Sequence, residues 1–202
     1  MWRTKRRSVE FDAAPWVGWP KLLQYCDNSP SQEHEALFVT LFETGCRVSE
    51  AIELKPEQFK FNDEAIIVRN AKVLKQKEKR RAQRNILIKL EDNPLAPKLI
   101  EIVENCDSEY LLPKRLRFSS SIDRFGHIAR STVYVKIKQI SPEIWPHWLR
   151  SQRASHLVFE RNLDAYALAD WFKWTSMDMP LHYINQTMEK MAANMGIKNV
   201  PS

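Results

Sequence analysis

The stretch TGCRVSE (Thr44–Glu50) decides how the chain folds around it, because its glycine separates two helical patterns. On its N-terminal side, residues 33–43 carry the nearly continuous apolar run of a largely buried helix. On its C-terminal side, a second helix is predicted from Ser49 to just before Pro56, whose ring disfavours helical geometry in the preceding residue. Arg47 is therefore predicted to lie at a corner between two helices. Taken alone, the stretch is more typical of a helix cap with a local ion pair between Arg47 and Glu50.

Strand patterns and further helices follow this corner. β-Branched runs at residues 65–68 and 86–88 predict an antiparallel hairpin with a long basic connection, and residues 110–113 predict a third, short edge strand. Pro146 is a typical entry signal for one of the later helices. Apolar periods predict helices over residues 97–105, 131–140, 148–161, 165–172 and 179–194. The expected fold class is α+β, mainly helical, with a small three-stranded antiparallel sheet.

Length and composition point to one intracellular domain. The 202 residues can bury a core without disulfides or metal, and residues 1–20, which have no regular period, are expected to be an arm or a linker remnant before a domain at 21–202. No segment reaches the roughly 18 apolar residues of a membrane span, and the N-terminus lacks the apolar stretch of a secretory signal. The three cysteines show neither metal-ligand spacing nor a paired framework, so we expect a reducing cytoplasm and no metal.

Positive charge is concentrated in one segment of the chain. The 31 Lys and Arg against 25 Asp and Glu give a net charge of +6, which favours a polyanionic partner. Residues 72–84 carry seven basic residues and a single acidic one, Glu78. A solvated loop or a localisation signal remains an alternative explanation of this run.

Three further positions could carry chemistry, each with a simpler explanation. His147 and Arg150 lie three residues apart on one predicted helical face, where two cationic side chains can bind an anion or occur together by chance. Tyr183 could be a buried aromatic residue with a bonded hydroxyl, which is the commoner role of a tyrosine on an amphipathic helix. Trp174 could be an ordinary core tryptophan.

The order and spacing of these weak signals are together specific. A TGxR corner is followed by a basic hairpin, an HxxR box after a proline, a tryptophan and then a tyrosine. In this, the sequence resembles the tyrosine recombinases, also called the phage integrase family, over residues 33–186. The resemblance implies the tyrosine-recombinase catalytic fold for residues 21–202, without the core-binding domain that usually precedes it. The chain is then either a fragment of a larger recombinase, which we favour, or a minimal form.

The resemblance assigns roles to individual residues. Arg47 and Arg150 would bind the non-bridging oxygens of the scissile phosphate, which their planar guanidiniums suit. His147 would take a proton from the nucleophile or hold a phosphate oxygen, and Glu50 would orient the arginine corner. Trp174 stands at a position that is His or Trp in the family, and Tyr183 matches the nucleophile that forms a 3′-phosphotyrosyl bond.

The hairpin would supply the last catalytic group and most DNA contacts. A lysine there protonates the leaving 5′ oxygen in the family, and Lys72 is the best match, with Lys75 or Lys77 as alternatives. The reaction implies no metal, ATP or other cofactor, since arginines stand in place of a cation and the covalent intermediate conserves the phosphoester. The expected DNA-binding residues are Lys75, Lys77, Lys79, Arg80, Arg81 and Arg84.

The family also implies partners and a cellular setting. The partner is double-stranded DNA, and the C-terminal helix is expected to join copies into a homo-oligomer, a tetramer, although that helix could equally pack on its own domain. Ser151-Gln152 stand where the family often has His-Thr, which suggests a divergent archaeal or viral member. We expect a nucleoid-associated protein or a viral protein in its host cell. A type IB topoisomerase-like activity and a non-catalytic DNA-binding module are the alternative functions.

Overall fold

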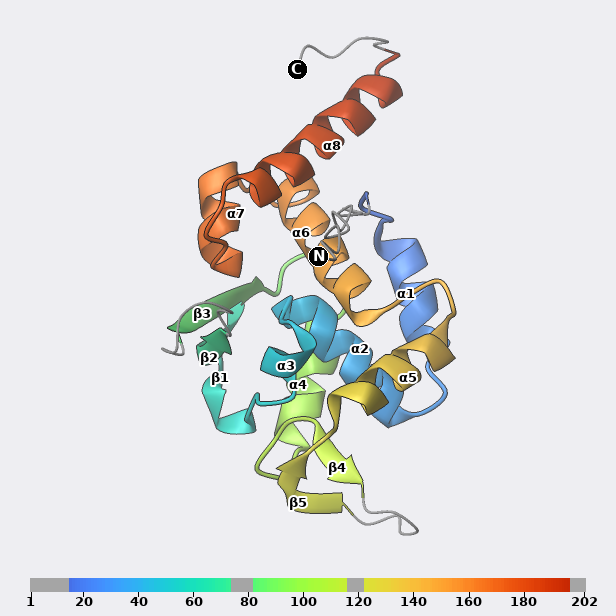
Figure 1. Ribbon diagram of the computed structural model, residues 1–202, viewed down its shortest axis with the longest axis vertical. Helices are drawn as coiled ribbons and strands as arrows, with labels where there is room; N and C mark the ends of the chain where they lie inside the picture. The colour runs from blue at the N-terminus through green and yellow to red at the C-terminus, as the bar shows by residue number, and fades with distance from the viewer. Residues whose placement is uncertain (1–14, 74–81, 116–121, 197–202) are drawn as a thin grey trace, which may run out of the picture.

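The computed structural model describes residues 15–73, 82–115 and 122–196, which form a mainly helical body with a small three-stranded sheet at one side (Figure 1). The expected α+β, mainly helical class is confirmed. The predicted helices recur within a few residues, apart from the one after the corner, which is shorter than expected. The helices are α1 (Trp19–Asp27), α2 (Gln32–Thr44), α3 (Val48–Ala51), the 3-10 helix η1 (Pro56–Gln58), α4 (Ala96–Glu104), α5 (Arg130–Ile140), α6 (Pro146–Phe159), α7 (Ala165–Phe172) and α8 (Asp178–Asn194).

The predicted hairpin is present as β2 (Ala65–Val73) and β3 (Ala82–Lys89), which pair antiparallel. Their inward side chains bury the β-branched runs, with Ile66 opposite Ile88 and Val68 opposite Ile86. The register then shifts, and Ala71 lies opposite Arg84. This irregularity includes Asn70, whose backbone φ of 55° lies in the left-handed region, which asparagine adopts more readily than most residues.

The third strand was predicted at the wrong place. The sheet order is β1-β2-β3, with β1 (Phe59–Phe61) as the edge strand beside β2. Residues 110–112 lie outside the sheet because the Leu111 amide donates to the Leu54 carbonyl at 2.8 Å, and both Leu111 and Leu112 are buried in the core. Pro113 instead begins β4 (Pro113–Arg115), which pairs with β5 (Ile122–His127) in a separate two-stranded sheet that was not predicted.

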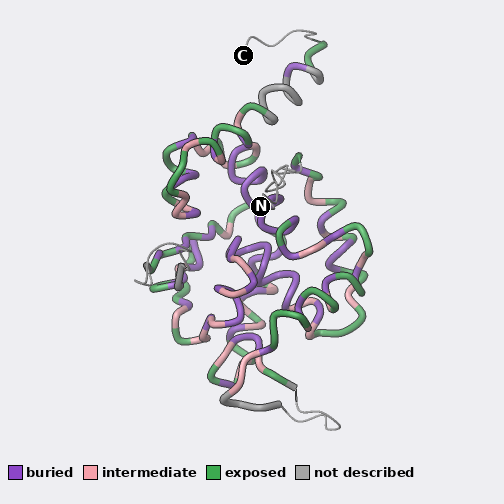
Figure 2. The backbone as a smooth tube through the Cα atoms, viewed as in Figure 1, coloured by how far each residue is buried: buried purple, intermediate pink, exposed green. Residues whose placement is uncertain are grey.

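The helix α2 is the centre of the core and packs against α1, α4, α5 and α6 (Figure 1). Buried positions run along α2 and α6 in Figure 2. A smaller apolar cluster joins α6, α7 and α8 and includes Leu157, Leu168, Phe172 and Tyr183. The corner after α2 and this second cluster both contact the same helix, α6, so α6 links the two halves of the site described below.

The N-terminal boundary of the folded unit lies before residue 20. Trp16 is buried and stacks on Phe42 with ring centroids 6.0 Å apart, and α1 begins at Trp19. Residues 15–20, expected to belong to an arm, are therefore partly packed on the core. No helix in the described ranges combines the length and the apolar character that a membrane crossing needs.

Candidate active site

The turn that carries Arg47 is fixed by its own polar groups and by a glycine. Gly45 ends α2 with a φ of 54°, a left-handed conformation that glycine adopts without steric penalty. A Cβ atom at Gly45 would lie 2.8 Å from Phe172 Cε1, so a side chain would also collide with α7. The Thr44 hydroxyl donates to the Thr40 carbonyl at 2.6 Å and accepts from the Cys46 amide at 3.3 Å. The side chain of Arg47 therefore extends from a rigid turn.

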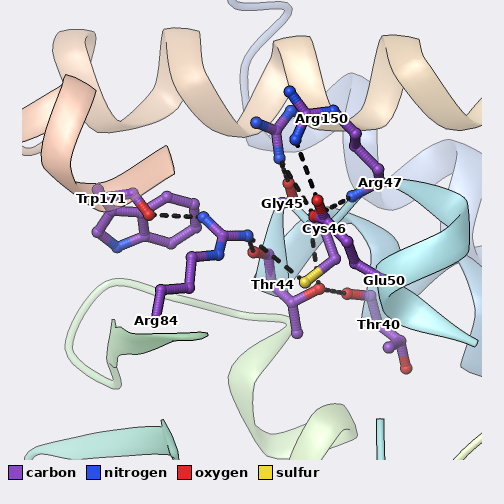
Figure 3. A network of polar contacts seen from close by, with 9 residues as sticks. All are labelled: Thr40, Thr44, Gly45, Cys46, Arg47, Glu50, Arg84, Arg150 and Trp171. Atoms are coloured by element: carbon purple, nitrogen blue, oxygen red, sulfur yellow. Dashed lines mark hydrogen bonds and ion pairs between the residues drawn. The ribbon is translucent and has the colours of Figure 1, made fainter. Parts of the chain in front are cut away.

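Arg47, in the turn before α3, and Arg150, on α6, converge on one buried carboxylate, that of Glu50 (Figure 3). Glu50 accepts from the Arg47 amide at 2.9 Å and from Arg47 Nη1 at 3.0 Å, and its Oε2 lies 4.0 Å from Arg150 Nη1. Arg150 also donates to the Gly45 carbonyl. The Arg47 side chain is 41% exposed, whereas those of Glu50 and Arg150 are buried. Glu50 thus holds Arg47 at the surface above Arg150.

Arg150 is a buried cation with one donor that no described residue satisfies. Burial lowers the pKa of Arg150 to about 9, helped by the positive charges of Arg47 and Arg84, so the guanidinium stays protonated at neutral pH. Its Nη2 atom is buried and has no hydrogen-bond partner among the described residues. A buried donor without an acceptor is unfavourable unless a ligand satisfies it. The geometry suits an anion with several oxygens, such as a phosphodiester.

His147 lies in the first turn of α6, on the same helix as Arg150. His147 is exposed as a whole residue. Its pKa is nevertheless lowered, mainly because the surrounding protein removes water from the imidazole. The charges of Arg150 and Arg47 lower this pKa further. The imidazole is therefore neutral at pH 7 and can accept a proton beside the two arginines.

A stack of aromatic rings links Arg150 to Tyr183. The Arg150 guanidinium lies over the Phe172 ring, 4.5 Å from its centroid, and Phe172 stacks on Trp174 with centroids 4.5 Å apart. Trp174 in turn stacks on Tyr183 at 5.6 Å with the ring planes 1° apart. The turn after α7 therefore places Trp174 between Phe172, which lies against Arg150, and Tyr183.

Tyr183 lies inside the α6–α7–α8 cluster and is only 2% exposed. Its hydroxyl donates to the hydroxyl of Ser151, which follows Arg150 on α6, at 3.1 Å. Burial raises the pKa of Tyr183, against the opposing effects of Ser151 and Arg150, so the phenol is protonated at neutral pH. Ser151 was noted in the sequence only as a departure from the family pattern, and that departure was the available signal for its contact.

The hairpin residues are only partly described. Lys72 lies on β2 opposite Gln83, one register pair from Arg84, and its side chain lies outside the described part. Among the expected DNA-binding residues, Lys75, Lys77, Lys79, Arg80 and Arg81 also lie outside the described residues.

Arg84, expected to bind DNA, is instead 2% exposed and donates to protein atoms. Its position at the end of a basic run gave no sign of burial, because the alternation of β3 turns it inward with Ile86 and Ile88. In the described ranges, no group of three or more His, Cys, Asp and Glu could hold a metal ion.

Comparison with known proteins places this geometry in a family. The profile of the phage integrase family matches residues 19–190. The putative integrase/recombinase y4qK of Sinorhizobium fredii is 27% identical over 168 residues, which cover 80% of this chain and 49% of that relative. The chain thus spans about half the length of its curated relative.

Solved structures confirm the tyrosine-recombinase fold. The XerH site-specific recombinase, in a post-cleavage complex with a palindromic difH substrate, has a TM-score of 0.64 at 15% identity, covering 95% of this chain and 55% of that one. For the XerA recombinase the TM-score is 0.61 at 16% identity, with 93% and 67% covered. For a lambda integrase dimer bound to a COC′ core site it is 0.56 at 16% identity, with 84% and 47% covered. Together with the profile match over most of its length, these findings show that the chain belongs to the phage integrase family.

Proposed function

We propose that this chain is the catalytic domain of a site-specific DNA recombinase or integrase, which cleaves and rejoins DNA through a 3′-phosphotyrosyl bond to Tyr183. The observation that carries the proposal is the pair of guanidiniums around Glu50, with a buried donor of Arg150 left for an anion. The names of the matched relatives, which are integrases and recombinases, support strand exchange over a topoisomerase-like activity or a non-catalytic module.

In this mechanism the arginines bind the scissile phosphate and stabilise the charge that gathers on its oxygens during attack. The neutral His147 takes the phenolic proton as Tyr183 attacks phosphorus. The bond to the 5′ oxygen breaks, and Lys72 supplies the proton that this oxygen needs, with Lys75 or Lys77 as the alternative donors. Attack by a 5′-hydroxyl on the phosphotyrosine reverses the steps and reseals the strand.

Attack also requires Tyr183 to leave its position in the apolar cluster. In the structure its hydroxyl is bonded to Ser151 and its ring is stacked on Trp174, so the phenol does not face solvent. Trp174 would then remain beside Arg150, where its indole N–H can donate to a phosphate oxygen. The structure therefore corresponds to a resting state of the proposed enzyme.

The proposal extends to partners and place of action. We infer that the chain acts on double-stranded DNA as a homotetramer joined through α8, in the cytoplasm, either at the nucleoid or as a viral protein in its host. The projection of α8 beyond the body in Figure 1 and the 46% exposure of Leu181 support an intermolecular role for this helix. Mass photometry with DNA carrying two target sites tests the tetramer.

A nicked, end-labelled suicide duplex tests the reaction, because loss of the short strand after cleavage traps the covalent intermediate. We expect the wild-type chain, without metal and over a range of salt, to form a protein–DNA adduct that survives denaturant. Tyr183→Phe removes the nucleophilic oxygen and should form none. Tyr166→Phe is the matched control, since Tyr166 is 78% exposed on α7 and should retain the adduct.

Two results would contradict the proposal. An undiminished adduct in Tyr183→Phe would assign the nucleophile elsewhere. DNA binding without an adduct on any substrate, including one with the host attachment site, would instead favour a non-catalytic DNA-binding module.

A further inference from the structure

Arg84 is a buried cation whose partners are uncharged. Its side chain lies on β3 at 2% exposure, and no carboxylate in the described ranges pairs with it. Removing a guanidinium from water is strongly unfavourable unless its donors are satisfied. A third positive charge beside Arg47 and Arg150 is also unfavourable by itself, because like charges repel. These unfavourable effects indicate that Arg84 has a role beyond filling space in the core.

The Arg84 guanidinium joins two segments of the active site (Figure 3). Nη2 donates to the Thr44 carbonyl at 3.2 Å and to Cys46 Sγ at 3.4 Å, so it holds the turn directly before Arg47. Nη1 donates to the Trp171 carbonyl at the end of α7, and the guanidinium lies 5.1 Å from the Trp171 ring centroid. The same contact therefore holds the helix end that leads to Trp174.

The strand that carries Arg84 adds a third segment. Arg84 pairs in register with Ala71, which directly precedes Lys72 on β2. One side chain thus connects the hairpin, the arginine corner and the end of α7, which lie far apart in the sequence. The fork of a guanidinium can satisfy acceptors on two segments at once, whereas an ammonium is a single point of donation.

We propose that Arg84 is a positioning residue, which fixes the Thr44–Arg47 turn relative to α7 and the hairpin so that the phosphate-binding arginines and Trp174 act as one site. The inference rests on the proposed recombinase function of the same site. Arg84 contacts no reacting atom in this role. It acts through Thr44, Cys46 and Trp171, and its loss should slow cleavage while leaving most DNA contacts in place.

The test compares Arg84→Lys and Arg84→Met with Arg153→Lys in single-turnover cleavage of the suicide duplex, well below each melting temperature. Arg153 is the matched control, because it is 1% exposed on α6 and pairs with Glu43 at 3.2 Å. A misplacement near 1 Å can slow a reaction about 100-fold, and we expect about that loss in Arg84→Met and about 10-fold in Arg84→Lys. DNA affinity should change less than about threefold, and Arg153→Lys should cleave at nearly the wild-type rate.

Hydrogen exchange of the folded proteins gives a second measurement that does not depend on catalysis. We expect faster exchange in peptides covering residues 44–50 and 171–175 of both Arg84 variants, and unchanged exchange of residues 44–50 in Arg153→Lys. Wild-type cleavage rates in both Arg84 variants would overturn the proposal. A wild-type rate in Arg84→Lys alone would also overturn it, because it would show that only the positive charge of Arg84 matters and not its two-segment hydrogen bonding. If the wild-type chain forms no adduct, the proposed function fails, and unchanged exchange in the Arg84 variants would separately refute the positioning role.

Discussion

At the scale of single residues, the site combines a preformed arginine corner with a proposed nucleophile, Tyr183, that is buried and hydrogen-bonded. The guanidiniums of Arg47 and Arg150 are already oriented by Glu50 and by the Gly45 carbonyl. Tyr183, by contrast, is buried against Trp174 and bonded to Ser151. In the proposed mechanism, the free energy needed to release Tyr183 would therefore add to the barrier for cleavage.

Ser151→Ala tests this contribution. The hydroxyl of Ser151 accepts from Tyr183 at 3.1 Å in a buried setting, and such a hydrogen bond contributes about 1 kcal/mol to the resting arrangement. If release limits the rate, removing the bond should speed single-turnover cleavage by up to about fivefold. Ser155→Ala, at another buried serine of α6, is the control and should leave the rate unchanged. A slower Ser151→Ala enzyme would instead mean that Ser151 assists the attack.

The site residues differ in how far the sequence could predict them. Arg47, His147, Arg150, Trp174 and Tyr183 lie in motifs, so they could be named before the structure, and their catalytic roles remain proposals. Arg84 could not be assigned correctly because a basic run gives no information about which side chain points inward. That depends on the register of β3, which is set by the pairing of Ile86 and Ile88 across the sheet.

At the scale of elements, α6 combines the proposed catalytic residues with structural ones in one helix. Its first turns carry His147, Arg150 and Ser151, and its later turns carry Arg153 and His156, both buried. Arg153 pairs with Glu43 of α2 at 3.2 Å, and His156 lies against Trp16, Trp19 and Phe42. The second half of α6 thus fixes the helix to α2 and to the chain before α1.

His156 makes this packing sensitive to acid. Burial lowers the pKa of His156 from 6.5 to about 2, with Arg153 and Arg161 adding to the effect, so the unfolded chain binds a proton that the folded chain excludes. Its neutral form supports the fold fully above pH 6.5, and that support is lost as the pH falls below this value. Each pH unit removes about 1.4 kcal/mol from the free energy of unfolding.

Urea unfolding between pH 8 and pH 5.5 measures this slope. Burial raises the pKa of Glu43, so its protonation as the pH falls acts in the opposite direction. We expect His156→Phe to flatten the slope below pH 6.5 by about 1.4 kcal/mol per pH unit, while His182→Gln, at an exposed position of α8, should keep it. An unchanged slope in His156→Phe would show that another group causes the acid sensitivity.

Helix periodicity was a better guide than strand patterns at this scale. The long helices α2 and α5 to α8 have clear apolar periods or entry prolines, so they were placed nearly at their observed bounds. The helix α1 was missed because it begins at Trp19 and Pro20 in a stretch without a clear period, and the packing of Trp19 on Phe42 and His156 is a long-range contact. The edge strand β1 has only three residues, Phe59 to Phe61, too few for alternation to be informative.

At the scale of the whole molecule, some lysines are paired within the protein, whereas a separate basic run is expected to bind DNA. Lys98 pairs with Glu35, Lys136 with Glu33 at 3.1 Å, and Lys138 donates to the Pro142 carbonyl at 2.6 Å. These lysines of α4 and α5 are partly satisfied within the protein. The basic run of residues 72–84 has seven cations and a single acidic residue, so we expect it to provide a large share of the phosphate contacts.

The salt dependence of DNA binding tests this expectation. Each phosphate contact releases counterions, so the slope of log K against log salt should become less steep by about 0.9 for each contact removed. Substituting Lys79, Arg80 and Arg81 with Gln should therefore weaken binding to all sequences and reduce the slope by up to about 2.7. The same change at Lys98, Lys136 and Lys138 removes equal charge and should barely alter the slope. Equal slopes in the two triple variants would mean that net charge, rather than the hairpin, determines how this chain binds DNA.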